Sequence, residues 1–293
     1  MKESILYQKL PDSKKVRCDT CNHRCIIDIG HKGICGVRKN IEGTLYALNY
    51  ERTISLAIDP IEKKPLYHFM PGTKTYSIAT IGCNLSCKWC QNWQISQLQN
   101  IEKYEEDLPG EIISPEEHVM KALEYGCPSI SYTYTEPTIF LEYALDVMKI
   151  AKKNGLRNIW VTNGYMTTEA LDLIAPYLDA ANIDLKAWNN DTYIKYCGSK
   201  VQPILDNIRY LKEKNIHQEI TTLIVPGVND DQEQLTYIAN FIAEVSIDIP
   251  WHLSRFFPGW QMLDTPITPL ETLRMAEKIG KDAGLLHIHI GNI

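Results

Sequence analysis

Short apolar runs alternate with longer segments of helical periodicity over most of this chain, from about residue 76 onward. Runs rich in β-branched and aromatic residues predict strands at 76–81, 129–134, 158–162, 181–185, 219–225 and 250–253. Segments long enough for a helix separate these runs, and such crossovers join parallel strands. The pattern therefore predicts an α/β fold made of six strand–helix units.

Helix start signals and apolar spacing support this alternation. Ser114 precedes Pro115, and Glu117 follows three residues after the serine, which predicts a capped helix start. The segment 268–271, Thr-Pro-Leu-Glu, repeats the arrangement near the C-terminus. Apolar residues at 139, 143, 147 and 150, and at 204, 208 and 211, each fit one face of a helix. These segments are therefore predicted to be helical.

Six units favour an open, partial barrel over a flat doubly wound sheet, although periodicity does not separate the two. In both architectures the loops at the carboxyl ends of the strands bind ligands. The chain has no Gly-rich dinucleotide fingerprint and no phosphate-binding loop. Candidate site residues are therefore expected at the strand ends.

The composition limits domain number and partners. A chain of 293 residues suffices for one large α/β domain with a small appendage, or for two modest domains. The formal net charge of -6, with no basic block, argues against sequence-independent nucleic-acid binding. No apolar run reaches the length of a membrane span, and the first residues begin no signal peptide. We expect a soluble, cytoplasmic protein with neither nucleic acid nor membrane as a partner.

Nine cysteines in such a protein indicate metal ligands or buried thiols, because the cytosol keeps thiols reduced. Seven of them form two groups. The first has the spacing C-x2-C-x3-C-x9-C and consists of Cys18, Cys21, Cys25 and Cys35. The second has the spacing C-x3-C-x2-C and consists of Cys83, Cys87 and Cys90. Cys127 and Cys197 stand alone and are expected to be buried small hydrophobes.

The second group follows the first predicted strand and has no fourth cysteine at cluster spacing. A four-iron cluster is normally held by four thiolates, so three ligands on one loop leave one iron open. An open metal position is a catalytic position. Two other interpretations, a closed zinc site and a ferredoxin-like electron carrier, take Cys127 or Cys197 as a further ligand.

With Trp89 directly before Cys90, this loop resembles the signature of radical S-adenosylmethionine enzymes. The resemblance implies a 4Fe-4S cluster on the three cysteines, whose open iron chelates the amino and carboxylate groups of the methionine part of the cofactor. It also implies reductive cleavage of a carbon–sulfur bond and a 5'-deoxyadenosyl radical that takes hydrogen from a substrate. Trp89 is then expected beside the cofactor.

Two segments narrow the resemblance. Residues 59–72, which read DPIEKKPLYHFMPG, and residues 92–96, NWQIS, are similar to AmmeMemoRadiSam system radical enzymes, a group related to pyruvate formate-lyase activating enzymes. The similarity runs from about Cys18 to the C-terminus and implies a six-unit partial β/α barrel. Gene neighbours of that group encode Memo-like and AMMECR-like proteins, which favours a small-molecule substrate.

Two functional classes stay open. The first is a radical enzyme, served by a flavodoxin or ferredoxin-type reductant, that acts on a small molecule or, like glycyl-radical activases, on a protein. The second is an iron–sulfur electron-transfer or metal-binding module without turnover.

Residues after the second and third strands are candidate cofactor contacts. Glu136 stands where the wider superfamily ends a Gly-Gly-Glu motif, and a carboxylate there accepts hydrogen bonds from the methionine ammonium. The other interpretation of Glu136 is a cap on the helix that starts near Thr138. Thr162 and Asn163 resemble the Thr-Asn-Gly turn of the activating enzyme, and a plain strand-to-helix turn is the alternative.

Alternation along the fourth strand places Asn182, Asp184 and Lys186 on one face. Three polar residues on one face of a central strand need a pocket or a hydrogen-bond network. The resemblance assigns Asp184 and Lys186 to the bound cofactor. A buried structural ion pair is the competing interpretation.

The fifth and sixth strands supply the remaining candidates. The resemblance implies that Ile224 or Val225 packs on the adenine of the cofactor. His252, Ser254 and Arg255 are predicted to contact substrate, because they are polar and are expected at the barrel mouth. A lone histidine in a strand is also commonly a satisfied core residue.

The four N-terminal cysteines predict a compact loop closed by a tetrahedral thiolate site. Zinc and an auxiliary iron–sulfur cluster both accept four thiolates, and the lack of a C-x2-C-x2-C run favours zinc. His23 or His31 could replace one ligand, and four unliganded thiols are the other interpretation. We expect a cysteine-rich region at 1–74 and the partial barrel at 75–293.

Overall fold

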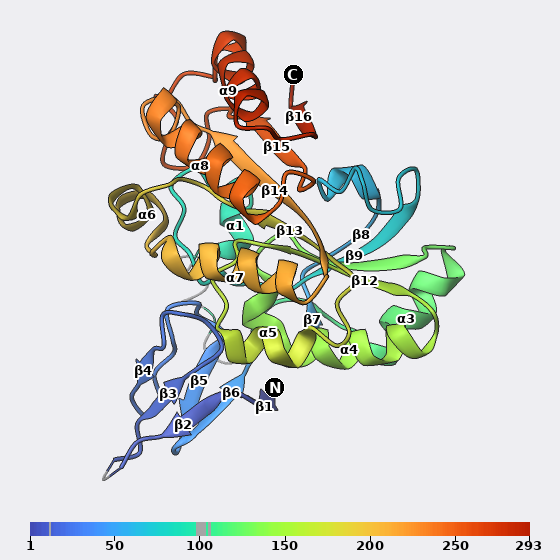
Figure 1. The fold of residues 1–293 in the computed structure, drawn as a ribbon. Coiled ribbons are helices and arrows are strands. Elements are labelled where there is room, and N and C mark those ends of the chain that lie inside the picture. The colour runs from blue at the N-terminus through green and yellow to red at the C-terminus, as the bar shows by residue number, and fades with distance from the viewer. Residues whose placement is uncertain (12, 98–103, 105–106) are drawn as a thin grey trace.

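An open sheet of eight strands forms the centre of the protein in the computed structural model, which describes residues 1–11, 13–97, 104 and 107–293 (Figure 1). The strands are β8 (Ser55–Pro60), β9 (Lys74–Ala79), β11 (Ser129–Tyr132), β12 (Arg157–Thr162), β13 (Ala180–Asp184), β14 (His217–Ile224), β15 (Trp251–Arg255) and β16 (Ile288–Gly291). Their order is β16-β15-β14-β13-β12-β11-β9-β8. Neighbours from β9 to β16 are parallel, and β8 is antiparallel to β9. The predicted α/β partial barrel is confirmed, with β8 and β16 added at its edges.

Helices connect successive parallel strands and cover the outer face of the sheet (Figure 1). They are α3 (Pro115–Glu124), α4 (Leu141–Lys153), α5 (Thr168–Ile174), α6 (Asn190–Cys197), α7 (Gln202–Glu213), α8 (Gln232–Val245) and α9 (Leu270–Asp282). Three shorter elements are η1 (Ile61–Lys63), α1 (Trp93–Ser96) and η2 (Pro137–Phe140). Each predicted strand is thus followed by at least one helix before the next strand of the sheet.

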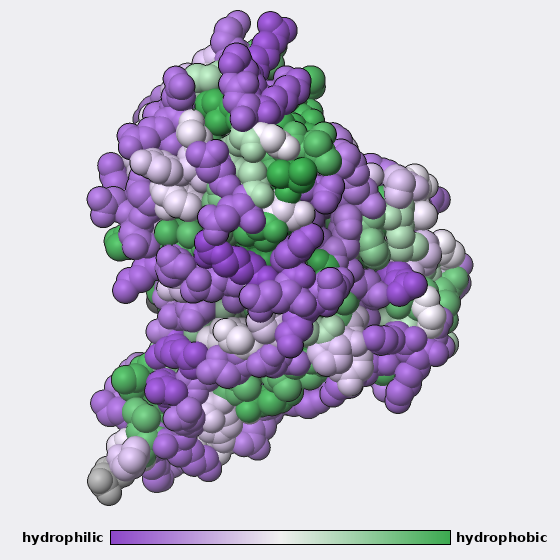
Figure 2. All heavy atoms as spheres, viewed as in Figure 1, coloured by the Kyte–Doolittle hydropathy of each residue, from purple (hydrophilic) through white to green (hydrophobic). Residues whose placement is uncertain are grey.

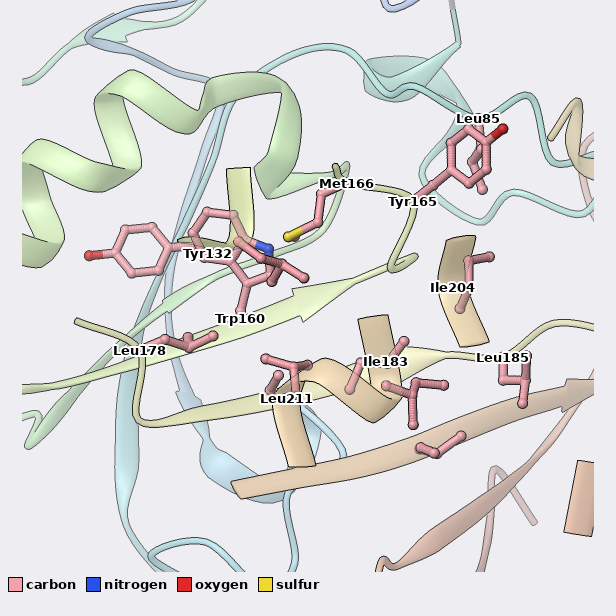
Figure 3. Packing of buried hydrophobic residues seen from close by; sticks show 14 of the residues in the cluster. Leu85, Tyr132, Trp160, Tyr165, Met166, Leu178, Ile183, Leu185, Ile204 and Leu211 are labelled. Carbon is pink, nitrogen blue, oxygen red and sulfur yellow. The ribbon is translucent and has the colours of Figure 1, made fainter. Parts of the chain in front are cut away.

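Alternation along the strands gives the sheet two different faces. Large apolar side chains fill the outer face beneath the helices, where Tyr132 and Trp160 are almost fully buried with ring centroids 5.5 Å apart (Figure 3). Small and polar side chains occupy the inner face, including the paired positions Ser77 and Ser131 and, further along the sheet, Asn182. The inside of the barrel therefore carries polar side chains, together with an apolar patch around Ile159.

The segment after β8 closes the amino end of the barrel. Leu66 packs on Ile159 of the inner face. The backbone amides of Tyr67 and His68 donate hydrogen bonds to the Glu219 carboxylate at 3.0 and 2.8 Å. Because these contacts lie near the starts of β12 and β14, the opposite end, where the cysteine loop lies, is left for ligands.

Residues 1–47, which we call the cysteine-rich unit, form two small sheets of order β1-β6-β5 and β2-β3-β4. Their strands are β1 (Lys2–Glu3), β2 (Tyr7–Lys9), β3 (Val16–Cys18), β4 (Ile26–Ile27), β5 (Arg38–Ile41) and β6 (Thr44–Ala47). Arg38 joins the unit to α4 through a buried ion pair with Glu142 at 2.8 Å. The domain boundary between residues 74 and 75 stays a prediction, and β8, which precedes it, is paired with β9.

One of the two predicted helix starts is confirmed. The Ser114 hydroxyl accepts a hydrogen bond from the Glu117 amide, and α3 begins at Pro115. For the second, a helix does begin at the predicted place, since α9 starts at Leu270, but its predicted side-chain cap is wrong. The Thr268 hydroxyl instead donates to the carbonyl of Ile224 at 2.6 Å. The residue that was predicted to cap the helix therefore makes a tertiary contact with β14.

No helix within the described ranges is both long and apolar enough to cross a membrane. On the face shown in Figure 2, hydrophilic residues predominate, and apolar residues form separate patches among them. Most of the buried apolar side chains in the described residues belong to one large core cluster, and two small clusters lie in the cysteine-rich unit and at the amino end of the barrel.

Candidate active site

The loop of residues 82–91, here called the cysteine loop, follows β9 at the carboxyl end of the barrel. Gly82 opens it with a φ of +103°, a conformation that residues with side chains rarely adopt. The end of α6 holds the loop from the side: the amides of Ser86 and Lys88 donate to the carbonyls of Cys197 and Tyr196, both at 2.9 Å. The fold therefore fixes the backbone that carries the three thiols.

The three thiols of the cysteine loop have different surroundings. The Cys90 sulfur lies 3.1 Å from the Ser96 hydroxyl. Burial raises the pKa of Cys83. A hydrogen bond with the thiol of Cys197 lowers the pKa of Cys87. Cys197 is buried, as expected, but it is also a direct neighbour of the loop, which its isolated place in the sequence did not indicate.

Glu136 lies beyond the end of β11 and is 1% exposed. One carboxylate oxygen accepts from the amide and hydroxyl of Thr138 at 3.0 and 2.5 Å and from the hydroxyl of Thr162 at 2.7 Å. The other accepts from the amide of Asn163 at 2.8 Å. Burial raises the pKa of Glu136. The carboxylate thus caps η2 and ties the ends of β11 and β12 together, and its role toward a cofactor stays a prediction.

The turn that contains Thr162 and Asn163 connects this carboxylate to the cysteine loop. The side-chain amide of Asn163 donates to the Asn84 side-chain oxygen at 2.7 Å and lies 3.8 Å from the Cys83 sulfur. The prediction from the sequence omitted Asn84, although its place directly after Cys83 puts it in the loop. The fold therefore brings two predicted cofactor residues and Glu136 next to one predicted cluster ligand.

Asp184 and Lys186 lie at the carboxyl end of β13, with the Lys186 ammonium 2.7 Å from the Asp184 carboxylate. The side chains are 37% and 14% exposed, respectively. Burial alone would lower the pKa of Lys186, but the charges of Asp184 and Cys87 raise it well above its ordinary value. The competing interpretation, an ion pair, is therefore present, and the pair also faces the cysteine loop.

Two predicted cofactor contacts lie in the apolar core. Trp89 is 5% exposed and packs near Tyr196 with ring centroids 5.9 Å apart, so it helps to hold the loop on α6. Ile224 is 0% exposed and pairs in register with Arg255, on the outer face of β14. Its neighbour Leu223 faces the barrel interior, which corrects the expectation that Ile224 is the residue presented to a ligand.

The expectation that His252 lies at the barrel mouth is wrong. β15 extends to Arg255, two residues beyond its predicted end, so His252 lies near the start of the strand. It is 5% exposed, and its Nε2 lies 2.7 Å from the Glu219 carboxylate. Arg255 does lie at the carboxyl end, where its Nε donates to the carbonyl of Thr268 at 2.8 Å. Its predicted contact with substrate stays a prediction.

A histidine cluster surrounds Glu219 at the amino end of the barrel, and the prediction from the sequence missed it. Five of the eight histidines belong to it: His68, His217, His252, His287 and His289. Burial alone would raise the pKa of Glu219, but hydrogen bonds from His217 and His252 and from two backbone amides lower it to about 2. The alternation of His287 and His289, just before and within β16, was the available sequence signal.

A cavity of about 410 Å³ borders the cysteine loop. Residues 83–86 and 88 of the loop line it, together with Ile34, Lys195 and Trp260. Its volume falls in the range of small-molecule pockets, roughly 300–1,000 Å³. Of the three thiols, that of Cys83 therefore stands beside space that a group larger than a single ion can fill, whereas Cys87 and Cys90 are not among the lining residues.

The four cysteines of the cysteine-rich unit enclose a far smaller cavity, of about 10 Å³. All four line it, as does Arg38, whereas His23 and His31 are not among its lining residues. Such a volume holds about one small atom. Burial raises the pKa of Cys21, and that of Cys35 to about 11. The donor set and the size fit one metal ion better than an iron–sulfur cluster.

The two groups of thiols are candidate metal sites. Within the described residues, no three His, Cys, Asp or Glu side chains already stand in the geometry of a bound metal ion. Cys83, Cys87 and Cys90 are the residues that could hold a cluster, and the four N-terminal cysteines could hold a single ion.

Known proteins resemble this chain over its whole length. A family model described as the Radical SAM superfamily matches residues 77–237. The chain is 45% identical over 294 residues to an uncharacterized protein of Methanocaldococcus jannaschii, and the match covers 100% of this chain and 86% of that protein.

More distant matches include an activating enzyme and a solved structure. The pyruvate formate-lyase 1-activating enzyme of Escherichia coli strain K12 is 25% identical over 169 residues, which are 56% of this chain and 66% of that enzyme. A radical SAM methyltransferase from Sphaerobacter thermophilus shares the fold, with a TM-score of 0.58, 17% identity, and coverage of 76% of this chain and 67% of that one. The chain belongs to the radical SAM superfamily, whose members carry a 4Fe-4S cluster and S-adenosylmethionine, and it is an enzyme related to pyruvate formate-lyase activating enzymes.

Proposed function

We propose that this protein cleaves S-adenosylmethionine reductively and uses the resulting 5'-deoxyadenosyl radical to abstract hydrogen from a small-molecule substrate. The observation that supports this most is the meeting of the cysteine loop with the strand ends, where Asn163 connects Glu136 to the surroundings of Cys83. When bound to the three thiolates, a 4Fe-4S cluster with an open iron supplies the electron for the cleavage.

The residues around the loop take distinct roles in this proposal. When the cofactor is bound, Glu136 would accept hydrogen bonds from the methionine ammonium. These would replace some of the hydrogen bonds that the carboxylate now accepts from Thr138 and Asn163. Lys186 places a partly buried cation beside the thiols, where it would attract the cofactor carboxylate. Asn163 orients the cysteine loop through Asn84, and Leu223 offers an apolar contact from the inner face.

We also propose that the protein belongs to the AmmeMemoRadiSam group. The segment 59–72, on which that resemblance depends, packs inside the amino end of the barrel. Since this segment closes one end, a substrate has to approach from the carboxyl end, beside the cysteine loop. That route suits a small molecule, and a functional link to Memo-like and AMMECR-like proteins belongs to the same proposal.

The second candidate function is activation of a glycyl-radical enzyme, which the 25% identity to pyruvate formate-lyase 1-activating enzyme favours. Both functions need an external reductant, for which a flavodoxin or ferredoxin-type protein is proposed. The candidate docking side borders the cavity at the cysteine loop, where Lys88 and Lys195 supply positive charge.

We further propose zinc in the cavity of the cysteine-rich unit, since tetrahedral zinc takes four thiolates and occupies the space of one atom. Seven grouped cysteines without a disulfide fit a reducing, cytoplasmic location.

The proposal is tested by adding dithionite and S-adenosylmethionine to the anaerobic, reconstituted protein and assaying 5'-deoxyadenosine. We expect deoxyadenosine from the wild type and none from Cys87→Ala. An intact cluster without deoxyadenosine would support the module without turnover instead. Deuterium transfer into deoxyadenosine from labelled metabolites, compared with labelled protein, then separates the two enzyme functions.

A further inference from the structure

The cysteine-rich unit grips the cysteine loop at two points, and each point lies beside a cysteine of the small cavity. At the first, the backbone of Cys35 packs against Gly82. A Cβ on Gly82 would lie 2.9 Å from the Cys35 carbonyl oxygen and 2.8 Å from the Val37 side chain. The residue before Cys83 is therefore enclosed by the cysteine-rich unit.

The second point is a hydrogen bond between His23 and the loop backbone. His23 lies between Cys21 and Cys25 in the sequence, and its Nε2 is 2.7 Å from the carbonyl oxygen of Asn84. Because a carbonyl only accepts, His23 Nε2 carries the proton and donates. The same imidazole packs edge-on against Tyr165, with ring centroids 5.0 Å apart, so its orientation is fixed from two sides.

The side chain of Asn84 connects this hydrogen bond to the candidate cofactor site. Its side-chain oxygen accepts from the Asn163 amide group at 2.7 Å, and the Asn163 backbone amide donates to Glu136 at 2.8 Å. A continuous path of hydrogen bonds and covalent bonds therefore runs from His23 through Asn84 and Asn163 to Glu136.

The turn after β12 holds the segment that carries His23 in place through hydrogen bonds. The Asn22 amide donates to the carbonyl of Tyr165 at 3.1 Å, and the Asn22 side chain donates to the carbonyl of Met166 at 2.6 Å. The Thr167 hydroxyl donates to the carbonyl of Asp19 at 2.7 Å. Residues 19–23 are thus docked on the same turn that carries Asn163.

We propose that the four-cysteine centre positions the cysteine loop, with His23 as the positioning residue, so that a metal ion in the small cavity and the cluster on the loop stabilise one another. An ion held by Cys21, Cys25 and Cys35 fixes the segments that carry both grips. Such coupling is reciprocal by thermodynamic necessity. The inference rests on the proposed function, because it takes the loop to be the cluster site.

The test compares three variants of the full, anaerobically reconstituted protein: His23→Ala, His23→Gln and His31→Ala. Glutamine keeps an N–H donor. His31 is the matched control, because it is exposed in the same unit and its side chain hydrogen-bonds to the nearby carbonyl of Ile29 rather than to the cysteine loop. The readouts are the rate at which a chelator bleaches the visible absorbance of the cluster, and the zinc content.

We expect His23→Ala to lose the cluster about fivefold faster than wild type, the effect of one typical hydrogen bond. His23→Gln should recover most of the difference, and His31→Ala should match wild type. Loss of the cluster at wild-type rate from His23→Ala would overturn the inference.

A second measurement approaches the coupling from the metal side. Cys25→Ser, which removes a ligand of the small cavity without touching either grip, should lower the zinc content and also hasten loss of the cluster. Zinc loss with an unchanged cluster would overturn the inference while leaving the proposed function intact. A wild type that takes up no cluster would overturn both.

Discussion

The two groups of thiols differ above all in the space beside them. Four cysteines in the cysteine-rich unit enclose about 10 Å³, whereas the cysteine loop borders about 410 Å³ through Cys83 and its neighbours. A cation lies near each group, the buried Arg38 near the first and the partly buried Lys186 near the second. Although both groups consist of thiols near a cation, the different volumes of the cavities beside them predict different functions. A closed site holds an ion and stabilises the fold, and an open one leaves a position for a reactant.

The largest effect is expected from removing one thiol from each group. Cys87→Ala should abolish cluster binding and all formation of 5'-deoxyadenosine, because no other thiol of the loop can replace it. The variant should still bind the N-terminal ion, although less tightly, since the two sites stabilise one another. Cys25→Ala should do the reverse, losing the ion while the loop still takes up iron. Iron and zinc analysis with a deoxyadenosine assay checks both. If Cys87→Ala retained wild-type iron, the assignment of the open site would be wrong.

The next prediction compares the buried ion pair near the first group with the partly exposed ion pair near the second. Arg38 and Glu142 are 2% and 0% exposed, so Arg38→Met should cost about 3–5 kcal/mol of unfolding free energy by leaving a buried carboxylate unpaired. Lys186→Met is the control at the open site, where Asp184 is 37% exposed and water can solvate it. Urea unfolding of both variants measures the difference. An equal loss from the two substitutions would show that the closed site is not the more strongly anchored one.

Lowering the pH should destabilise the fold that carries both thiol groups, through His118, which contacts neither group. His118 is 0% exposed and bonds to the hydroxyls of Thr53, Tyr76 and Tyr143, and burial lowers its pKa to about 4. As the pH falls below about 6.5, His118 becomes protonated in the unfolded state but stays neutral in the folded state. The free energy of unfolding therefore decreases as the pH falls.

The loss through His118 should reach about 2 kcal/mol between pH 6.5 and pH 5. Urea unfolding at the two pH values measures it, and His118→Gln should flatten that part of the profile. A profile that the substitution leaves unchanged would exclude His118 as the cause. The comparison of the two thiol groups is therefore best made above pH 6.5.

The smallest effect is expected from Cys197→Ala. Its thiol contacts Cys87, yet three cysteines of the loop suffice for a cluster with an open iron. We expect the variant to keep its iron and most of its cleavage activity, with a loss of about 1 kcal/mol in stability for a buried side chain. Iron content decides the matter, since its loss would make Cys197 a fourth ligand and the loop a closed site.

The sequence predicted the barrel well, because parallel strands beneath helices read as apolar runs and the helices between them show a clear period. It did not predict β8, an edge strand antiparallel to β9. It also did not predict β16, where His289 interrupts a short apolar run.

Predictions for single site residues depended on where each strand ends. Asn163, Asp184 and Lys186 came out near the cysteine loop because their turns follow the strand ends directly. His252 was misplaced because β15 continues to Arg255. The histidine cluster combines residues from 68 to 289, and no local pattern brings such distant positions together.

The central claim, one open cluster and one closed ion, is tested most directly by electron paramagnetic resonance of the reduced protein before and after S-adenosylmethionine is added. The account predicts the signal of a single 4Fe-4S cluster per chain that changes when the cofactor binds. A signal that the cofactor leaves unchanged, or a second cluster signal from the cysteine-rich unit, would contradict it.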